Sequence, residues 1–144
     1  KIAILGFAFK SNTNDTRESA AIQICKNLMD EGAELFINDP KVNPTQISKD
    51  LGIEEMSRRS KEEEINNNFN DWSWNFKEKV NDTFASADAV LILTEWSEYS
   101  KIDWTEAAQL MRKPAWVFDA RSITDPKKVV ESGLNYWRVG DGLI

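Results

Sequence analysis

The chain has 144 residues, of which 41% are hydrophobic and 29% charged, and its net charge is −6. This length predicts one globular domain, and the acidic balance argues against a nucleic acid partner, because binding to phosphate backbones favours a basic surface. No apolar run is long enough to span a bilayer and no signal peptide is visible, so we expect a cytoplasmic protein with no membrane partner. The abrupt start at a strand, without Met, predicts a piece of something longer.

The sequence contains one cysteine, Cys25, and no histidine. A single cysteine excludes an internal disulfide and suits a reducing compartment. Without histidine the chain lacks the commonest general base and the commonest metal ligand, so we expect no metal site. Cys25 falls on the apolar face of a predicted helix, which favours packing in the core over reactivity.

The beginning of the chain predicts a βαβ unit. An apolar run at 1–5 predicts a strand, three- and four-residue spacing predicts a helix over 18–31, and 33–38 predict a second strand. We expect Asp15 or Thr16 to cap the helix. Strands joined by a crossover helix are parallel, and the crossover is right-handed.

The alternation of strands and helices continues to the end of the chain. Further strands are predicted at 72–76, 89–94, 115–120 and 134–139. Further helices are predicted at 44–51, at 77–87, at 103–112, and from Asp125 to Gly133. The continuously apolar run at 89–94 is typical of a central parallel strand, and the last strand reads as an edge. The whole pattern predicts a Rossmann-like α/β fold: an open, mostly parallel sheet with helices on both faces, in three layers.

Residues 54–71 interrupt this pattern. The segment EEMSRRSKEEEINNNFND is charged and rich in asparagine, with little apolar periodicity. Such a composition is typical of exposed chain. We interpret 54–71 as a surface insertion within a domain that spans 1–144.

Three cations follow the predicted strands at the edge where open α/β sheets bind their ligands. Lys10 and Arg17 come after the first strand, and Arg121 comes after the strand at 115–120. A lysine can meet a phosphate as a point charge, and an arginine fork suits phosphate or carboxylate. Phe9 offers a flat surface for a base or sugar, as Trp96 also does. The residues alone therefore predict a site for a small anion such as a nucleotide diphosphate.

Each candidate also has a structural interpretation. Lys10 can simply be solvated, and Arg17 can form a local ion pair with Asp15 that contributes little at a surface. Asp39, in the turn signal Asn-Asp-Pro, is more typical of a turn than of a ribose ligand. Trp96 can cover the sheet edge instead of stacking on a ligand. The residues alone leave these alternatives open.

The stretch GFAFKSNTNDTRES at 6–19 resembles a motif of the UDP-glucose/GDP-mannose dehydrogenase family, at the opening of its C-terminal, nucleotide-sugar-binding domain. That motif runs G-x-A-F/Y-K, two residues, then T-x-D-x-R-x-S, and every fixed position matches. The resemblance continues through LMDEGAELFINDPKV, SADAVLILTEWSEY and KPAWVFDARSI, and covers nearly all of the chain except about 53–76. The segments TEW and DPKV look most like the members that act on UDP-glucose. The sequence departs from the family at Ala120, where glycine is frequent, and in 54–71.

The resemblance implies a larger bidomain enzyme that oxidises UDP-glucose to UDP-glucuronate with two NAD. UDP-glucose or UDP-glucuronate is then the expected partner, NAD is bound mainly by an absent N-terminal domain, and the full-length protein is a homodimer or higher oligomer. The resemblance assigns substrate binding to Phe9, Lys10 and Arg121, and places Arg17 toward the cofactor NAD. No catalytic residue is expected in this chain, because Cys25 does not match the position of the family's nucleophile. The chain alone should therefore be inactive.

Two other functions stay open. The domain can belong to a dehydrogenase of UDP-N-acetylmannosamine or GDP-mannose, because sugar selectivity in the family depends largely on residues outside this chain. A different class is a non-catalytic doubly wound regulatory module, such as a receiver. A receiver would carry an acidic cluster after its first strand, where this chain has the basic stretch GFAFK.

Overall fold

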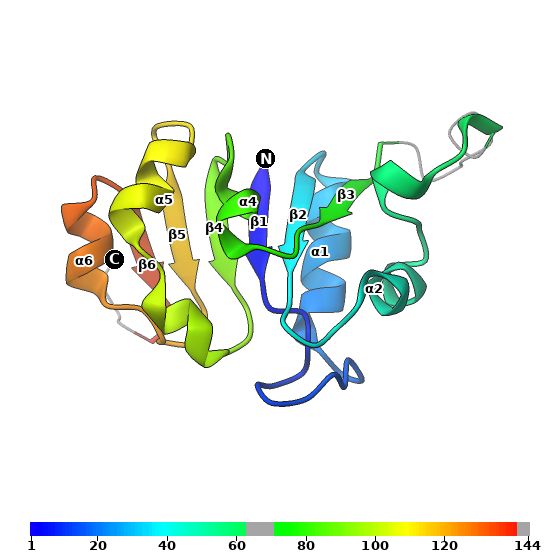
Figure 1. Ribbon diagram of the computed structural model, residues 1–144, viewed down its shortest axis with the longest axis horizontal. Coiled ribbons are helices and arrows are strands. Elements are labelled where there is room, and N and C mark those ends of the chain that lie inside the picture. Colours follow the sequence, from blue (N-terminus) through cyan, green and yellow to red (C-terminus); the bar gives the residue numbers. More distant parts are fainter. Residues whose placement is uncertain (63–70, 141–144) are drawn as a thin grey trace.

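The computed structural model describes residues 1–62 and 71–140, and within them lies a six-stranded sheet whose strands are all parallel. The strands are β1 (Ile2–Leu5), β2 (Glu34–Asn38), β3 (Ser73–Phe76), β4 (Ala89–Ile92), β5 (Trp116–Asp119) and β6 (Asn135–Arg138). Their order is β3-β2-β1-β4-β5-β6, with β4 in a central position and β6 at one edge, as predicted (Figure 1). The chain reverses direction across the sheet between β1 and β4, which makes this the switch point of a doubly wound fold.

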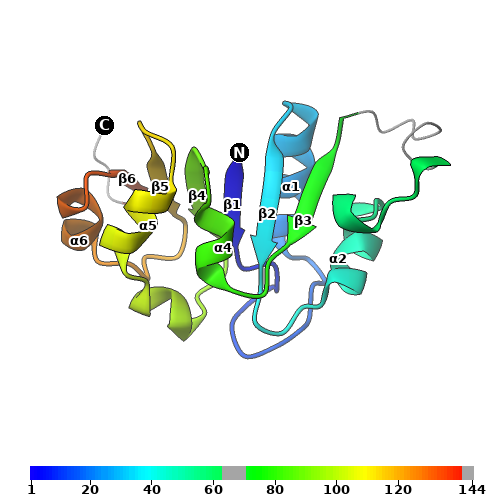
Figure 2. The ribbon, with the colours of Figure 1, turned by 45° about the horizontal axis from the view of Figure 1, so that its top comes forward.

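Helices cover both faces of the sheet, which confirms the predicted three-layer α/β fold. They are α1 (Ala20–Asp30), α2 (Pro44–Leu51), α4 (Val80–Phe84), α5 (Trp104–Leu110) and α6 (Pro126–Glu131), with 3₁₀ turns η1 (Met56–Arg58) and η2 (Ser97–Lys101). One face carries α4, α5 and α6, and α1 lies on the opposite face (Figures 1 and 2). None of the helices in the described ranges is long and apolar enough to cross a membrane.

Side-chain caps set the starts of three helices. Asn43 Oδ1 accepts a hydrogen bond from Gln46 N–H at 2.8 Å, and the next residue is the proline that opens α2. Asp103 caps α5 in the same way, and Asp125 caps α6 ahead of a proline. An oxygen-bearing side chain that precedes a helix satisfies one of its unbonded N–H groups, which is why these starts could be read from the sequence.

The start of α1 differs from the prediction. Ser19 is its N-cap, with Oγ accepting from Ala21 N–H at 3.3 Å, whereas Asp15 and Thr16 lie before the helix. Glu18 has a positive φ of 59°, so the chain turns sharply immediately before the cap. The loop after β1 is therefore longer than the sequence pattern suggested, and α1 correspondingly shorter.

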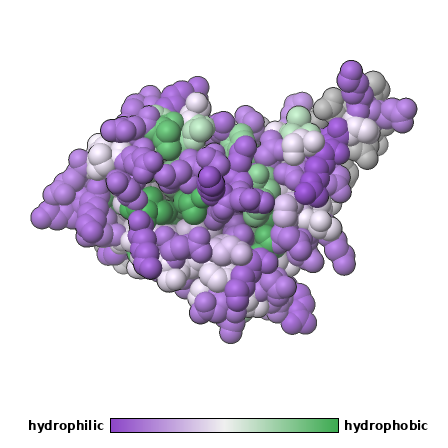
Figure 3. Space-filling view, in the orientation of Figure 1, coloured by the Kyte–Doolittle hydropathy of each residue, from purple (hydrophilic) through white to green (hydrophobic). Residues whose placement is uncertain are grey.

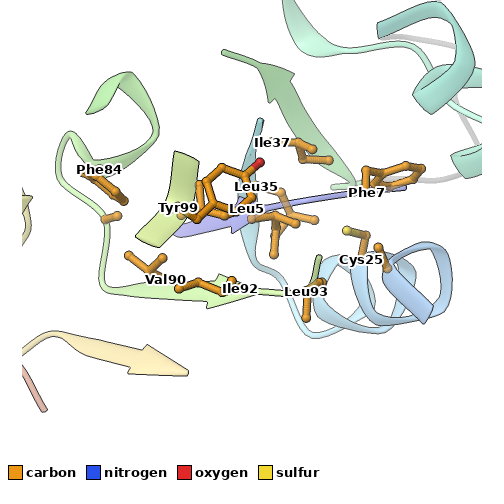
Figure 4. Close-up of a cluster of buried hydrophobic side chains, with 14 of the residues drawn as sticks. Leu5, Phe7, Cys25, Leu35, Ile37, Phe84, Val90, Ile92, Leu93 and Tyr99 are labelled. Carbon is orange, nitrogen blue, oxygen red and sulfur yellow. The ribbon is translucent and has the colours of Figure 1, made fainter. Parts of the chain in front are cut away.

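The core fills both sides of the central strands. Figure 4 shows Val90 and Ile92 of β4 among these buried side chains, together with Tyr99 from η2. The Tyr99 hydroxyl donates to the backbone oxygen of Asn38 at 3.1 Å and lies 2.9 Å from its Oδ1. Burial raises the pKa of Tyr99, so its hydroxyl stays protonated. This contact ties η2 to the end of β2.

The first part of the predicted insertion is attached to the edge strand β3. Glu55 is only 5% exposed, and its Oε2 accepts a hydrogen bond from Phe76 N–H at 2.9 Å. Its Oε1 pairs with Arg58 Nε at 2.9 Å. The segment thus begins as a packed extension of the sheet, and residues 63–70 lie outside the described residues.

The face of the sheet that carries α1 is only partly covered. Over β5 and β6, where none of the described helices lies, Trp116 is 42% exposed and Trp137 is 45% exposed. The Phe118 ring lies between them, stacked on Trp116 with centroids 5.6 Å apart and tilted by 54° against Trp137 with centroids 6.1 Å apart. An apolar hollow of about 390 Å³ separates this aromatic row from Ile24 and Leu28 of α1. Parallel sheets are ordinarily covered on both faces, so this half-face is an unusual feature of the domain.

Gly6, directly after β1, lies very close to Thr94, two residues after the end of β4. Gly6 has a φ of +95°, and a Cβ built there would lie 2.4 Å from Thr94 Cβ. Gly133 has a similar φ of +89°, but a Cβ there would meet nothing within 4 Å. Substitutions at Gly6 and Gly133 can therefore separate the free-energy cost of a left-handed backbone from the cost of overpacking.

We predict that Gly6→Ala destabilises the protein more than Gly133→Ala does. Gly133→Ala should lower the free energy of unfolding by about 1–2 kcal/mol, the cost of the left-handed conformation. Gly6→Ala should lower it by roughly 1–3 kcal/mol more, because the added methyl overpacks the contact with Thr94. Urea unfolding followed by circular dichroism measures both losses, and equal losses would contradict the close contact.

Candidate functional site

Asp39 ties together the loops that follow β1, β2 and β4. It is 3% exposed, and its Oδ2 accepts hydrogen bonds from the N–H groups of Phe7 at 2.8 Å and Ala8 at 3.0 Å. The indole Nε1 of Trp96 donates to the same oxygen at 3.1 Å. Asp39 follows β2, Phe7 and Ala8 follow β1, and Trp96 follows shortly after β4. One buried carboxylate thus fixes loops on both sides of the switch point.

The other oxygen of Asp39 shapes the turn after β2. Oδ1 accepts from the N–H groups of Lys41 at 2.8 Å and Val42 at 2.9 Å, as Asp does in an Asx turn. This confirms that Asp39 is a turn residue, and both of its oxygens are already bonded within the protein. Lys41 also lines a polar hollow of about 410 Å³ with 12–14, and sequence reasoning assigned it no role.

Two hydroxyl groups hold the backbone of the loop at 6–19 from either side. Thr94 Oγ1 donates to Ala8 O at 2.8 Å, and Ser19 Oγ donates to Phe7 O at 2.7 Å. The loop projects beyond the carboxyl ends of the strands, at the bottom of Figure 1. Figure 3 shows that this projection is mainly hydrophilic. Its base is therefore fixed to the sheet, while its outer side chains face solvent.

Phe9 and Lys10 lie on the outer part of this loop. Phe9 is 46% exposed, and its N–H donates to Asp15 O at 2.8 Å, which closes the loop on itself. Lys10 is exposed, and its positive charge helps to lower the pKa of Asp15 and of Glu95. An aromatic ring and an ammonium group are thus both exposed at the edge where open α/β sheets bind their ligands.

Arg17 forms the local ion pair that the sequence allowed. Its Nε donates to Asp15 Oδ1 at 3.0 Å and its Nη2 to Oδ2 at 2.8 Å, and the Arg17 side chain is 88% exposed. The hydrogen bond from Arg17 lowers the pKa of Asp15 to about 2, so the carboxylate stays ionised at neutral pH. Asp15 thus binds one edge of the Arg17 guanidinium, and the rest of the group faces solvent.

Arg121 is held at the end of β5 by its backbone and by its side chain. Its N–H donates to Oδ1 of Asp119, a fully buried residue, at 2.9 Å. The guanidinium does not reach that carboxylate: Nε donates to Leu93 O at 2.9 Å and lies 3.5 Å from Glu95 Oε2. Asp119 is therefore paired with Arg121 through the peptide N–H alone. None of the hydrogen bonds recorded for the described residues uses the Nη atoms of Arg121.

Two other candidates are structural. Trp96 is 5% exposed with its indole bound to Asp39, so it covers the sheet edge and offers no stacking surface. Cys25 is fully buried on the side of α1 that faces the sheet (Figure 4). Burial raises the pKa of the Cys25 thiol to about 12, which confirms a packing role and makes it a poor nucleophile. Within the described ranges, no group of three His, Cys, Asp or Glu residues is placed to hold a metal ion.

Comparison with known proteins identifies the family. A family model described as "UDP-glucose/GDP-mannose dehydrogenase family, UDP binding domain" matches residues 3–126. The chain belongs to this family. It is 40% identical over 143 residues to UDP-glucose 6-dehydrogenase of Drosophila melanogaster, covering 97% of this chain and 28% of that protein. It is 36% identical over 162 residues to UDP-glucose 6-dehydrogenase 4 of Arabidopsis thaliana, covering 99% of this chain and 30% of that protein.

Solved structures show the same fold. NDP-N-acetyl-D-galactosaminuronic acid dehydrogenase from Methanosarcina mazei Go1 superposes with a TM-score of 0.71 at 19% identity, over 96% of this chain and 24% of that one. A UDP-glucose dehydrogenase from Pyrobaculum islandicum superposes with a TM-score of 0.60 at 22% identity, over 94% of this chain and 24% of that one. The chain spans less than a third of the length of the curated relatives it matches.

We predict that Asp39 is required for the stability of the family's loop at 6–19. Asp39→Asn places an amide NH₂ or a weaker acceptor against N–H donors, and should lower the free energy of unfolding by about 2–4 kcal/mol. Asp82→Asn, at an exposed position in the first turn of α4, is the matched control and should cost under about 1 kcal/mol. Thermal unfolding compares the variants, and similar melting temperatures for both would contradict the role of Asp39.

Proposed function

We propose that residues 1–144 form the C-terminal, UDP-sugar-binding domain of a UDP-glucose 6-dehydrogenase, which converts UDP-glucose to UDP-glucuronate with two NAD. The observation that carries this proposal is the pair of cations, Lys10 and Arg121, at the carboxyl ends of β1 and β5 on loops fixed by buried carboxylates. Cations on loops whose backbone is already fixed bind a diphosphate without the cost of ordering a mobile loop. The relatives that cover most of this chain are UDP-glucose 6-dehydrogenases.

Each substrate-binding residue has a distinct part in this proposal. Lys10, an exposed point charge, meets the diphosphate of UDP-glucose or UDP-glucuronate. Arg121 reaches the sugar nucleotide through its Nη groups, since its Nε is held by Leu93 O. Phe9 offers an exposed ring or its backbone to the nucleoside.

NAD is bound mainly by another domain in this proposal. A dinucleotide loop needs glycines that let backbone approach a pyrophosphate, and a helix N-terminus close to the first strand. Here the space beside Gly6 is filled by Thr94, and α1 begins only at Ala20, with Ser19 as its cap. Arg17, at the far end of the loop and facing solvent, is the one residue of this chain that we assign to the cofactor side.

The half-covered sheet face supports a place within a longer enzyme. Trp116 and Trp137 expose nearly half of their surface beside an apolar hollow, and the relatives are more than three times longer than this chain. We propose that the remainder of the full-length protein packs on this face and that the assembly is a homodimer or higher oligomer. A cytoplasmic location is proposed because the single cysteine remains a buried thiol.

We predict that the isolated chain binds UDP-glucose through Lys10 and Arg121. Lys10→Ala and Arg121→Ala should each weaken binding by roughly tenfold or more, the value of one charge-assisted contact. Lys49→Ala, an exposed lysine of α2, should leave binding unchanged. Isothermal titration calorimetry with UDP-glucose measures the effect of each substitution, and the same titration with GDP-mannose tests the preference for the nucleotide. No binding by the unaltered chain would contradict the proposal, and tighter GDP-mannose binding would favour the sister specificity.

We also predict that the isolated chain does not oxidise UDP-glucose. Its one thiol, Cys25, is buried with a pKa of about 12, so it cannot serve as the nucleophile of the reaction. Absorbance at 340 nm, where NADH absorbs, should stay at background after NAD and UDP-glucose are added. A full-length relative serves as the positive control, and NADH formation by the isolated chain would refute the prediction.

A further inference from the structure

Glu95 lies between the two cations of the candidate site. Its Oε1 accepts a hydrogen bond from Ser11 N–H at 3.2 Å, on the residue that follows Lys10. Its Oε2 lies 3.5 Å from Arg121 Nε, on the other side of the switch point. Glu95 is thus the side chain that connects the loop after β1 directly with the guanidinium after β5.

A carboxylate at this place needs an explanation, because the edge is proposed to bind an anion. A unit negative charge close to a bound phosphate costs binding energy at any effective dielectric constant. Glu95 is nevertheless ionised: burial raises its pKa, but the Ser11 N–H and the charges of Arg121 and Lys10 outweigh burial and hold it below the usual value. Electrostatic attraction for the ligand alone would favour a neutral residue here.

We propose that Glu95 is a positioning residue that aims Arg121 and the backbone beside Lys10 at the sugar nucleotide. This inference rests on the proposed function of the domain. Leu93 O accepts the Nε hydrogen of Arg121, and Glu95 Oε2 attracts the same edge of the guanidinium from 3.5 Å without a hydrogen bond, which leaves the Nη groups for the ligand. The bond to Ser11 holds the loop next to Lys10. The benefit of fixed geometry then exceeds the repulsion that Glu95 exerts on the ligand.

The two interpretations of Glu95 predict opposite changes in UDP affinity when Glu95 is replaced. If Glu95 is only a nearby charge, Glu95→Ala and Glu95→Gln should both tighten UDP binding. If Glu95 positions the site, Glu95→Ala should weaken UDP binding by about tenfold, because Ser11 N–H loses its acceptor and Arg121 keeps only Leu93 O as a partner. Glu95→Gln keeps an acceptor for Ser11 N–H and should weaken binding by less than about threefold.

The charge control is Glu98→Ala. Glu98 is exposed, lies three residues further along the same segment, and takes no part in the contacts just described. Glu98→Ala removes one negative charge, as Glu95→Ala does, and should leave UDP affinity within about twofold of the unaltered chain. Calorimetry at about 0.05 and 0.5 M salt separates the effects, since screening suppresses a charge effect and leaves a positioning loss in place.

A second measurement tests positioning without any ligand. Amide hydrogen exchange by NMR should show the Ser11 N–H protected in the free chain and exchanging about tenfold faster in Glu95→Ala, while Glu98→Ala changes nothing. Equal melting temperatures of the variants show that the fold is kept. Unchanged Ser11 exchange, or tighter UDP binding by Glu95→Ala, would overturn the inference. If the unaltered chain binds no UDP, the proposed function fails, whereas loss of Ser11 protection in Glu95→Ala would still establish the loop contact.

Discussion

The side chain of Asp39 is buried, and a buried polar group without hydrogen-bond partners is costly, so both of its oxygens need donors. The donors that satisfy it are N–H groups of the very loops that carry the candidate site: Phe7 and Ala8 after β1, and Trp96 after β4. The chain can bury Asp39 only if these loops converge. Burial of one side chain therefore determines the path of three segments that are distant in the sequence.

A consequence is that the domain begins like a dinucleotide fold and then departs from it. Thr94 occupies the space beside Gly6 and bonds Ala8 O, so the loop is directed outward before it returns to Ser19 and α1. A short glycine-rich turn would bring the helix N-terminus to the ligand. The longer loop brings side chains instead, which suits a site built on Lys10 and an arginine.

The sequence was sufficient for features that depend on local chemistry. The parallel direction of the strands follows from the helical crossovers between them, and the helices α2, α5 and α6 each begin directly after the side chain that caps them. It was insufficient where the partner lies far along the chain. Asp39 meets amides 31 and 32 positions away, and Glu95 meets one 84 positions away, and no local pattern indicates such pairs. The start of α1 was placed too early for a related reason, since the position of Ser19 depends on its bond to Phe7 O.

How the carboxylates near the site are satisfied determines which cations remain available. Asp39 and Asp119 are bonded by backbone N–H groups, so they neutralise none of the site's side chains. Asp15 holds Arg17, and Glu95 faces Arg121. Lys10 belongs to none of the ion pairs found among the described residues. Within a chain of net charge −6, Lys10 is then an exposed cation at this edge that no carboxylate holds at ion-pair distance, and an uncompensated cation of this kind attracts anions.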